Sequence, residues 1–242
     1  MTEITRRERL RAATELEIRE HARQLLVEQG QHAVTLRAIA RELGVTAPAL
    51  YRYYDSREDL LRHVGDDICM RLAAELTGAT AELDQADLPG RVFTVCRRLR
   101  TWALDHPNEF ELVFASRDVR ERPGRDGPLP DRFGQIFLAL LGDILAKDTP
   151  MPQAEAFPPD LEADLVAARD ALVASMSSLD IILPPQLLQL EALHSLLRWW
   201  VRVYGHIALE VFGRFPFDVR NAERLYEAML AELAEDTGVC GH

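Results

Sequence analysis

Lysine and cysteine are scarce in this 242-residue chain, and long apolar runs are missing. The three cysteines, Cys69, Cys96 and Cys240, are too few and too scattered for a disulfide framework. We therefore expect reduced thiols in or near a core, with Cys240 exposed close to the C-terminus. No apolar run approaches the roughly 20 residues that cross a bilayer, and no apolar stretch follows the charged N-terminus as a signal peptide requires. These absences predict a cytoplasmic protein without a membrane partner.

Common catalytic and metal-binding motifs are absent as well. The sequence has no G-x-S-x-G, P-loop or G-x-G-x-x-G motif, and its seven histidines show no metal-ligand spacing. His106 and His206, which stand near carboxylates, are the acid–base candidates that remain, and a single histidine in a helix is usually structural. We expect a protein that is not an enzyme and uses no cofactor or metal, with a helical enzyme as a minor alternative.

The net charge of −11 is unevenly distributed. Residues 1–65 hold 11 arginines and 10 acidic residues, whereas the remainder holds 17 basic and 29 acidic residues. Arginine supplies almost all of the positive charge, because Lys147 is the single lysine. The acidity therefore belongs to the later part of the chain, and the N-terminal part can still carry a local basic face.

Apolar residues recur three or four positions apart along the whole chain, which is typical of amphipathic helices. We find no convincing strand pattern and no internal repeat. Gly30 and Gly44 are expected to end the first two helices, Gly30 in a left-handed conformation. Thr35, Thr46 and Ser56 are expected to cap the next three, with Asp59 in the capping-box position after Ser56. The inner faces expected are Ile18, Ala22, Leu25 and Leu26, then Leu36, Ile39, Ala40 and Leu43, then Leu60, Leu61, Val64 and Ile68.

Longer helices are predicted downstream, separated by a polar segment with glycine and proline at 117–131 and by a proline-rich break at 148–159. The predicted helices lie near 88–105, from 107 onward, and near 132–147, 160–178, 186–212 and 219–235. The sequence therefore predicts an all-α fold. We expect an N-terminal three-helix domain at 1–65 and a second helical domain at 66–242.

The segment TLRAIARELGVTAPALYRYY contains the elements of a helix-turn-helix: a short amphipathic helix, a turn with glycine and a second short helix. Small residues at the start of the second helix, among them Thr46, Pro48 and Ala49, allow it to approach base edges in the major groove. Leu50 and Tyr54 are expected to point inward. The pattern predicts a DNA-binding surface, although ordinary helical proteins can also contain it.

The residues after this helix start carry the hydrogen-bonding groups. Arg52 can donate two hydrogen bonds to guanine, and Tyr51 and Tyr53 can reach phosphates and thymine methyl groups. Arg57, at the start of the fourth helix, is expected to contact a phosphate. The N-terminal arginines Arg6, Arg7, Arg9 and Arg11 either reach an adjacent groove or form a solvated helix start.

Residues 18–64 resemble the N-terminal domain of the tetracycline-repressor family without gaps. The resemblance rests on the motifs Ile39-Ala40, Leu43-Gly44-Val45, Leu50-Tyr51, Tyr53-Tyr54 and Ser56-Arg57-Glu58-Asp59-Leu60-Leu61, together with Gly30 and Thr35. Tyr54 replaces the usual Phe and Arg57 a common Lys. The resemblance implies that Thr35 and Arg37 touch DNA from the first helix of the motif. It also implies that Thr46, Pro48, Ala49, Tyr51, Arg52 and Tyr53 line the recognition helix, and that Arg57 takes a phosphate.

Two long apolar helices end the chain. Leu190, Leu193, Leu197, Trp200, Tyr204, Ile207 and Val211 form a stripe over about six turns, and Ala222, Leu225, Tyr226, Met229 and Leu233 share one face of the last helix. Such a pair suits a four-helix bundle across a two-fold axis, or else an intramolecular core. Because DNA binding of this kind is symmetric, we expect a homodimer. The predicted interface residues are Leu193, Leu197, Trp200, Leu225 and Met229.

The run WWVRVYGHIALEVFG resembles a regulatory domain of the Trp-His-Gly type that is found in part of the family. Trp200, Gly205 and residues 209–213 fit that pattern. Tyr204 stands where the histidine is expected, and His206 follows two residues later.

A sensor domain needs a cavity lined by large apolar groups and a few polar ones. The residues predicted to contact an apolar or aromatic inducer are Trp102, Phe114, Phe137, Trp199, Tyr204 and His206, with Phe110, Phe133, Met176 and Arg117 as further candidates. Most such residues belong to ordinary cores. The sequence thus predicts a helix-turn-helix DNA-binding domain at 1–65, followed by a helical ligand-binding and dimerisation domain at 66–242. Together they predict a repressor that a small molecule releases from a pseudo-palindromic duplex. The alternative is a DNA-binding protein of the same fold that is architectural or controlled by a protein partner.

Overall fold

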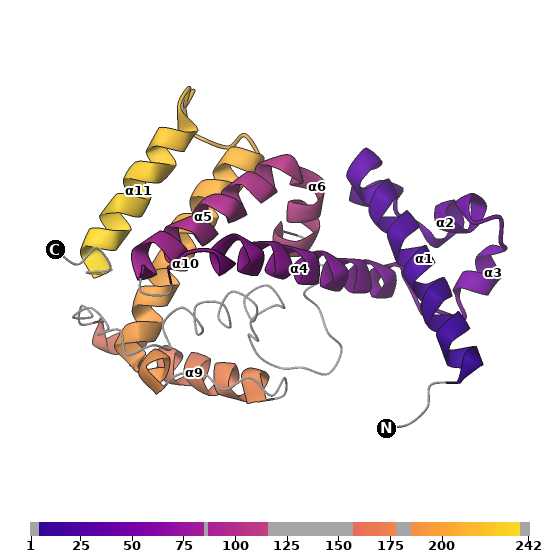
Figure 1. Cartoon of the computed structure of the whole chain (residues 1–242), viewed down its shortest axis with the longest axis horizontal. Helices are drawn as coiled ribbons and strands as arrows, with labels where there is room; N and C mark the ends of the chain where they lie inside the picture. Colours follow the sequence, from indigo (N-terminus) through magenta and orange to yellow (C-terminus); the bar gives the residue numbers. More distant parts are fainter. Residues whose placement is uncertain (1–4, 85–86, 116–156, 178–184, 238–242) are drawn as a thin grey trace. The chain divides into compact units, whose positions relative to one another are not determined.

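The computed structural model describes residues 5–84, 87–115, 157–177 and 185–237 (Figure 1). Every regular element in these ranges is helical, so the all-α prediction is confirmed. The chain divides into two compact units: residues 1–71 with 106–124, and residues 72–105 with 125–242. Within the described ranges, no helix is both long and apolar enough to cross a membrane.

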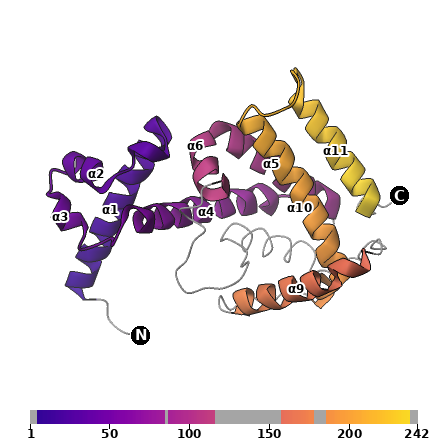
Figure 2. The ribbon, with the colours of Figure 1, turned by 180° about the vertical axis from the view of Figure 1, so that it is seen from behind.

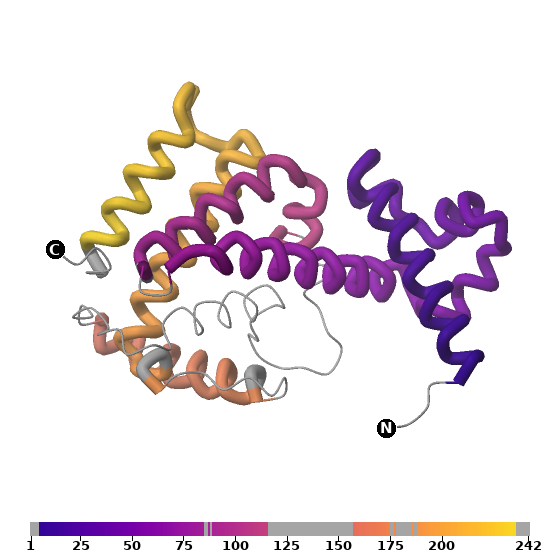
Figure 3. Tube along the Cα trace, in the orientation of Figure 1, coloured from indigo at the N-terminus to yellow at the C-terminus, as the bar shows by residue number. Residues whose placement is uncertain are grey.

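The first unit is built around a long helix, α1 (Arg6–Gln29), whose neighbours α2 (Leu36–Glu42) and α3 (Ala47–Leu50) are traced in Figure 3. A 3₁₀ turn, η1 (Gln31–Ala33), joins α1 to α2, and the first part of α4 (Arg57–Ala81) follows α3. The predicted inner faces of these helices are confirmed, because all of their side chains are buried except Leu43, which is half-buried. Burial of these aliphatic side chains is the main favourable term for the unit.

A segment from later in the chain completes this unit. α6 (Pro107–Phe110) packs against α1 and continues into the π-helical turn η2 (Glu111–Ala115). Phe110 and Phe114 are buried and stacked, with ring centroids 4.6 Å apart. The Asn108 side-chain amide donates a hydrogen bond to the Val27 carbonyl at 3.0 Å. The predicted helix from 107 onward is therefore a short α-helix and a wider turn that serve the N-terminal core.

Helix ends in the first unit lie where the sequence predicts them, but the Thr46 hydroxyl, which is expected to cap α3, accepts no capping hydrogen bond within the described residues. The Thr35 hydroxyl accepts a hydrogen bond from the Ala38 amide at 3.1 Å, so its predicted capping role is confirmed. Thr5 and Glu8 form a capping box that starts α1. Gly30 ends α1 as predicted, but with φ +79° and ψ 174° the predicted left-handed conformation is wrong. Its ψ lies outside the left-handed helical region, in a conformation that is essentially restricted to glycine.

The second unit contains the end of α4, α5 (Leu88–Asp105), α9 (Glu162–Ser177), α10 (Leu190–Val211) and α11 (Ala222–Thr237). Short 3₁₀ turns precede α9 and α10: η3 (Pro159–Leu161) and η4 (Pro185–Leu188). α10 packs against α5, α9 and α11, and Figure 2 shows this arrangement from behind. The last three predicted helices are confirmed within a few residues. The predicted helix near 132–147 lies outside the described residues. So do the predicted break at 117–131 and residues 148–156 of the second predicted break.

Buried and charged contacts hold α5 to the last two helices. The Tyr226 hydroxyl of α11 donates a hydrogen bond to the Cys96 carbonyl of α5 at 2.8 Å. Arg100 of α5 makes a two-pronged ion pair with Glu210 of α10, at 2.8 and 2.6 Å. Cys69 and Cys96 are buried, and burial raises the pKa of Cys96 to about 12, which keeps its thiol protonated.

Candidate nucleic-acid interface

α2, a turn and α3 form the predicted helix-turn-helix. The turn is closed by a hydrogen bond from the Val45 amide to the Ala40 carbonyl at 2.9 Å, and Gly44 supplies the positive φ of 65° that it requires. α3 is only one turn long, but the amides of Tyr53 and Tyr54 both donate to the Leu50 carbonyl, at 2.9 and 3.1 Å. The ordered recognition segment therefore extends from Ala47 to Tyr54.

Side chains along this segment alternate between the core and the solvent. Leu50 and Tyr54 are buried as predicted, whereas Tyr51 is 56% exposed. The segment brings together Thr46, Pro48, Ala49, Tyr51, Arg52 and Tyr53, and α2 adds Thr35 and Arg37; all of them are exposed except Ala49 and Tyr53, which are half-buried. These residues are therefore accessible to a duplex, while their individual DNA contacts stay predictions.

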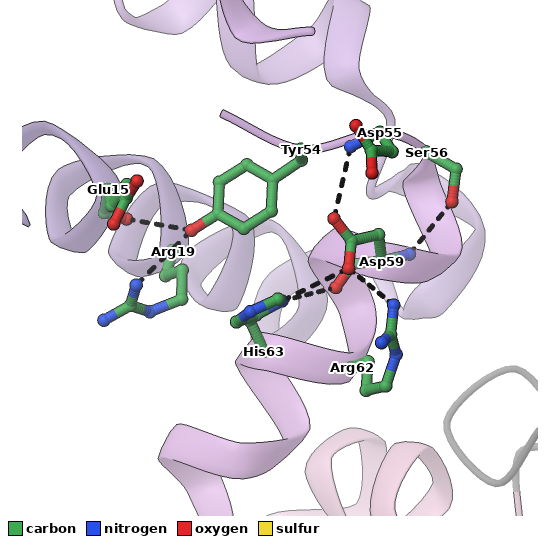
Figure 4. Close-up of polar contacts among 8 residues, drawn as sticks. All are labelled: Glu15, Arg19, Tyr54, Asp55, Ser56, Asp59, Arg62 and His63. Carbon is green, nitrogen blue, oxygen red and sulfur yellow. Dashed lines mark hydrogen bonds and ion pairs between the residues drawn. The ribbon is translucent and has the colours of Figure 1, made fainter. Parts of the chain in front are cut away.

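Tyr54 fixes the inner side of the segment (Figure 4). Its hydroxyl donates a hydrogen bond to the Glu15 carbonyl of α1 at 3.3 Å and accepts one from Arg19, also at 3.3 Å. Arg19 in turn pairs with Asp67 of α4. Burial raises the pKa of Tyr54, so its hydroxyl stays neutral and keeps its proton for this contact. Tyr54 thus couples the recognition segment to both α1 and α4.

The start of α4 is held by a modified capping box (Figure 4). The Ser56 hydroxyl accepts a hydrogen bond from the Asp59 amide at 3.0 Å, as predicted. The Asp59 carboxylate reaches back to the amide of Asp55, one residue further than in the usual motif, at 3.2 Å. The side chains of Arg62 and His63 also contact the Asp59 carboxylate. The junction between the recognition segment and α4 is therefore well anchored.

Arg57 and Arg11 have intramolecular contacts that sequence reasoning missed. The Arg57 guanidinium donates hydrogen bonds to the carbonyls of Val34 and Gln31, at 2.9 and 2.8 Å. Arg11 of α1 lies over the Tyr53 ring, 5.9 Å from its centroid, and pairs with Glu15. The sequence shows only that several arginines stand at the start of α1. It could not predict the contacts of Arg57 or of Arg11 with Tyr53, because they join residues at no characteristic sequence spacing. The exposed side chains of Arg6, Arg7 and Arg9 lie on the first turns of the same helix.

The predicted ligand-contact residues are divided between the two units. Trp102 is buried on α5, Trp199 and Tyr204 are half-buried on α10, and His206 is buried there too. Phe114 belongs instead to the core of the first unit, where it stacks on Phe110. Phe137 lies outside the described residues, as do the further candidates Phe133 and Arg117; of the Met176 side chain nothing is described. Contact with an inducer stays a prediction for all of them.

The surface hollows in the described part of the chain include one on α4 and α5 and one on α1. The first, of about 540 Å³, is lined mainly by charged residues, including Glu75 of α4, Glu82 just after α4 and Arg97 of α5. The other, of about 500 Å³, lies on α1 beside Leu16 and Arg71. Both are open to solvent, and neither is lined by a predicted ligand-contact residue.

His206 sits in an enclosed aromatic environment in the second unit. Its ring lies 5.0 Å from the Tyr226 ring and 5.4 Å from the Phe215 ring, and Glu210 is 3.8 Å from its Nε2 atom. Among the described residues, Nε2 has no hydrogen-bond partner. Burial lowers the pKa of His206, so the neutral ring is favoured.

The predicted dimer residues lie on α10 and α11. Leu197 is 51% exposed and Leu225 is 45% exposed, while Leu193, Trp200 and Met229 are half-buried. Val201, one turn beyond Leu197, is also exposed. Trp200 stacks on Tyr204 with ring centroids 5.6 Å apart. In the single chain, these helices therefore present large apolar side chains to solvent.

Comparison with known proteins agrees with this architecture. Residues 18–64 match the family of bacterial regulatory proteins of the tetR type, and residues 92–233 match a tetracyclin repressor-like C-terminal domain. The latter match corrects the expected Trp-His-Gly type of regulatory domain, which the findings do not support. Tyr204 replaces the histidine of that pattern, and the apolar spacing around Trp200 is common to long buried helices.

Similar proteins cover nearly the whole chain. HTH-type transcriptional regulators Rv1816 of Mycobacterium tuberculosis and Mb1846 of Mycobacterium bovis are each 29% identical over 95% of this chain and 97% of their own length. The crystal structure of regulatory protein SCO4313 is 30% identical, with a TM-score of 0.58 over 96% of this chain and all of that one. A structure from Rhodococcus sp. RHA1 shares the fold at 18% identity, with a TM-score of 0.56 over 92% of this chain and 94% of that one. The chain therefore belongs to the tetracycline-repressor family and is a helix-turn-helix DNA-binding transcription regulator, not an enzyme.

Proposed function

We propose that this regulator is a homodimeric repressor that binds a pseudo-palindromic operator and is released by an apolar or aromatic small molecule. The observation that carries the DNA-binding half is the set of exposed side chains on the recognition segment, while Leu50 and Tyr54 anchor the segment in the core. The exposed side chains are Thr46, Pro48, Tyr51 and Arg52. A short helix supported in this way can enter a major groove. DNA binding also places its action in the cytoplasm.

Dimerisation is proposed from the exposed leucines Leu197 and Leu225 on α10 and α11. Single exposed apolar residues are common, but here they lie on adjacent packed helices that end the chain. A second copy would cover them and would give the protein two recognition segments related by a two-fold axis. Helix-turn-helix dimers bind half-sites about one helical turn, or about 10 base pairs, apart, and we propose this spacing for the operator.

The sensor function is proposed from the aromatic residues of the second unit, including Trp102, Trp199 and Tyr204. A ligand shifts the DNA-binding equilibrium only if it binds the DNA-incompetent arrangement more tightly. A coupling of roughly 1–3 kcal/mol would lower DNA affinity by about 5–150-fold.

The test is selection of duplexes from a random library by the purified protein, followed by titration of the recovered duplex at several salt concentrations. We expect an inverted-repeat consensus and an affinity that falls steeply with salt, because bound arginines release counterions from DNA. Recovery of no preferred sequence would refute the operator. Apolar and aromatic compounds that raise the melting temperature of the protein are then added to the protein–DNA complex. Compounds that raise the melting temperature but leave DNA affinity unchanged would refute the small-molecule sensor. Release of DNA by a protein partner alone would refute it as well.

A further inference from the structure

We propose that Arg57 is a positioning residue of the helix-turn-helix: its guanidinium clasps the turn between α1 and α2 from inside the unit and makes no phosphate contact. This inference rests on the proposed operator binding by α2 and α3. It changes the role expected for Arg57, because an arginine at a helix start beside a recognition helix would ordinarily be read as a phosphate ligand.

The clasp uses one edge of the guanidinium. Arg57 Nε lies 2.9 Å from the Val34 carbonyl oxygen, and its Nη2 lies 2.8 Å from the Gln31 carbonyl oxygen. Nε and one Nη form the fork that arginine uses for two-pronged recognition of phosphate or carboxylate. Here the fork is engaged by two backbone carbonyls of the protein itself.

The remaining edge faces a negative charge. Arg57 Nη1 lies 3.7 Å from the Glu58 carboxylate, and three quarters of the Arg57 side-chain surface is buried, since its exposed fraction is 26%. A phosphate approaching this edge would meet the Glu58 carboxylate, and like charges at close range repel each other. Geometry and charge therefore both favour an internal role for Arg57.

The two carbonyls belong to the turn that sets where α2 begins. Gln31 O also accepts the Val34 amide at 3.2 Å, so the clasp reinforces a turn that is already closed. Val34 is fully buried, and the next residue, Thr35, caps α2. Arg57 itself follows the recognition segment through the anchored junction at Ser56. The clasp thus ties the start of α2 to the end of the recognition segment, and it sets the spacing between the two surfaces expected to touch DNA.

A lysine cannot reproduce this contact. Its ammonium keeps the positive charge but is a point donor without the planar fork, so it cannot reach both carbonyls in the same geometry. Arg57→Lys therefore separates the two roles: a phosphate contact would survive it in large part, whereas the clasp would not. The matched control is Arg37, which is exposed on α2 and is expected to touch DNA directly.

The experiment measures the affinities of Arg57→Lys, Arg57→Ala and Arg37→Ala for the selected duplex and for a random duplex, at several salt concentrations and well below each melting temperature. We expect both Arg57 variants to lose about the same factor, roughly tenfold or more, on the selected duplex and much less on the random one, with an unchanged salt slope. Arg37→Ala should weaken both duplexes and reduce the salt slope by about 1. An Arg57→Lys variant with wild-type affinity, together with a reduced slope for Arg57→Ala, would overturn the proposal.

A measurement on the wild-type protein covers the case in which both variants unfold. The Arg57 Nε–H signal in nitrogen-15 NMR should be protected from exchange in the free protein and keep its position when the selected duplex is added. Rapid exchange in the free protein, or a large shift on adding DNA, would contradict the clasp. If the wild type selects no duplex, the proposed operator binding fails, while the free-protein signal still tests the clasp.

Discussion

The Arg23 guanidinium of α1 lies 2.6 Å from the Glu109 carboxylate of α6, a residue 86 positions later in the chain. Glu109 is only 2% exposed, so this ion pair is the contact that neutralises a buried charge. His106 Nε2 lies 3.9 Å from the other carboxylate oxygen. The pair joins the N-terminal helix to a segment that sequence order assigns to the later domain.

Breaking this pair should destabilise the protein strongly. Arg23→Ala leaves the Glu109 carboxylate buried without its main partner, and loss of one partner of a buried pair costs about 3–5 kcal/mol. Because Arg23 is a quarter exposed, we expect the lower end of that range. Chemical denaturation followed by circular dichroism measures the loss. The control is Arg11→Ala, which breaks an exposed pair with Glu15 and should cost less than about 1 kcal/mol; equal losses in both variants would contradict the assignment.

Thr35 and Thr46 should differ in stability although both begin helices. The Thr35 hydroxyl accepts a hydrogen bond from the Ala38 amide, and removing such a cap costs about 1 kcal/mol. Thr46 occupies the same place before α3, but within the described residues its hydroxyl receives no capping hydrogen bond. We expect Thr35→Ala to lower the free energy of unfolding by about that amount and Thr46→Ala to leave it nearly unchanged. Equal effects would show that the cap contributes little.

Leu197 tests the proposed assembly. A charge at this 51%-exposed position would be buried without a partner in the dimer, so Leu197→Glu should give monomers at micromolar concentration. Val173→Glu is the matched control, because Val173 is a similarly exposed apolar residue on α9. Light scattering after size-exclusion chromatography gives the molar mass. A wild-type monomer, or a fully dimeric Leu197→Glu variant, would exclude this interface.

Arg52 is the residue expected to read a base. If its exposed guanidinium donates two hydrogen bonds to guanine, Arg52→Ala should cost about 1–3 kcal/mol of binding and relax selectivity at one position in each half-site. Repeating the duplex selection with the variant detects this change position by position. A consensus identical to that of the wild type would mean that Arg52 reads no base and contacts only the DNA backbone.

Stability should fall on acidification because of His206. Burial lowers its pKa below the ordinary value of 6.5, so below that pH the unfolded chain binds a proton more readily than the folded protein does. The groups that face it are Glu210 on its own helix, Arg100 of α5 and Tyr226 of α11. The neutral ring therefore contributes stability above pH 6.5, and this contribution is lost progressively as the pH falls toward the lower folded-state value.

The measurement compares denaturant unfolding at pH 7.5 and 5.5 for the wild type and for His206→Gln. We expect the variant to lose less stability between the two pH values, because it cannot take up the proton. His32→Gln, at an exposed histidine, serves as the control and should behave like the wild type. Identical pH dependence of the wild type and His206→Gln would refute this role.

Local signals in the sequence determined the helices, the caps at Thr35 and Ser56 and the exposed side chains of the recognition segment. Thr35, Gly44 and Ser56 act on backbone groups within a few residues of themselves, and the spacing of Leu36, Ile39 and Leu50 selects the face that packs inward. Interactions of this range are encoded in neighbouring positions, so the helix-turn-helix could be identified without the fold.

Only the tertiary structure decided which distant groups meet. Arg57 and the Val34 carbonyl are 23 positions apart, and Arg23 and Glu109 are 86 apart. Every residue has a backbone carbonyl, so the sequence does not indicate which carbonyl accepts a hydrogen bond from a distant side chain. A single arginine or glutamate is also compatible with an exposed position on a helix. Packing, which depends on shape and burial over the whole unit, placed Phe114 in the N-terminal core and turned Arg57 toward the protein interior.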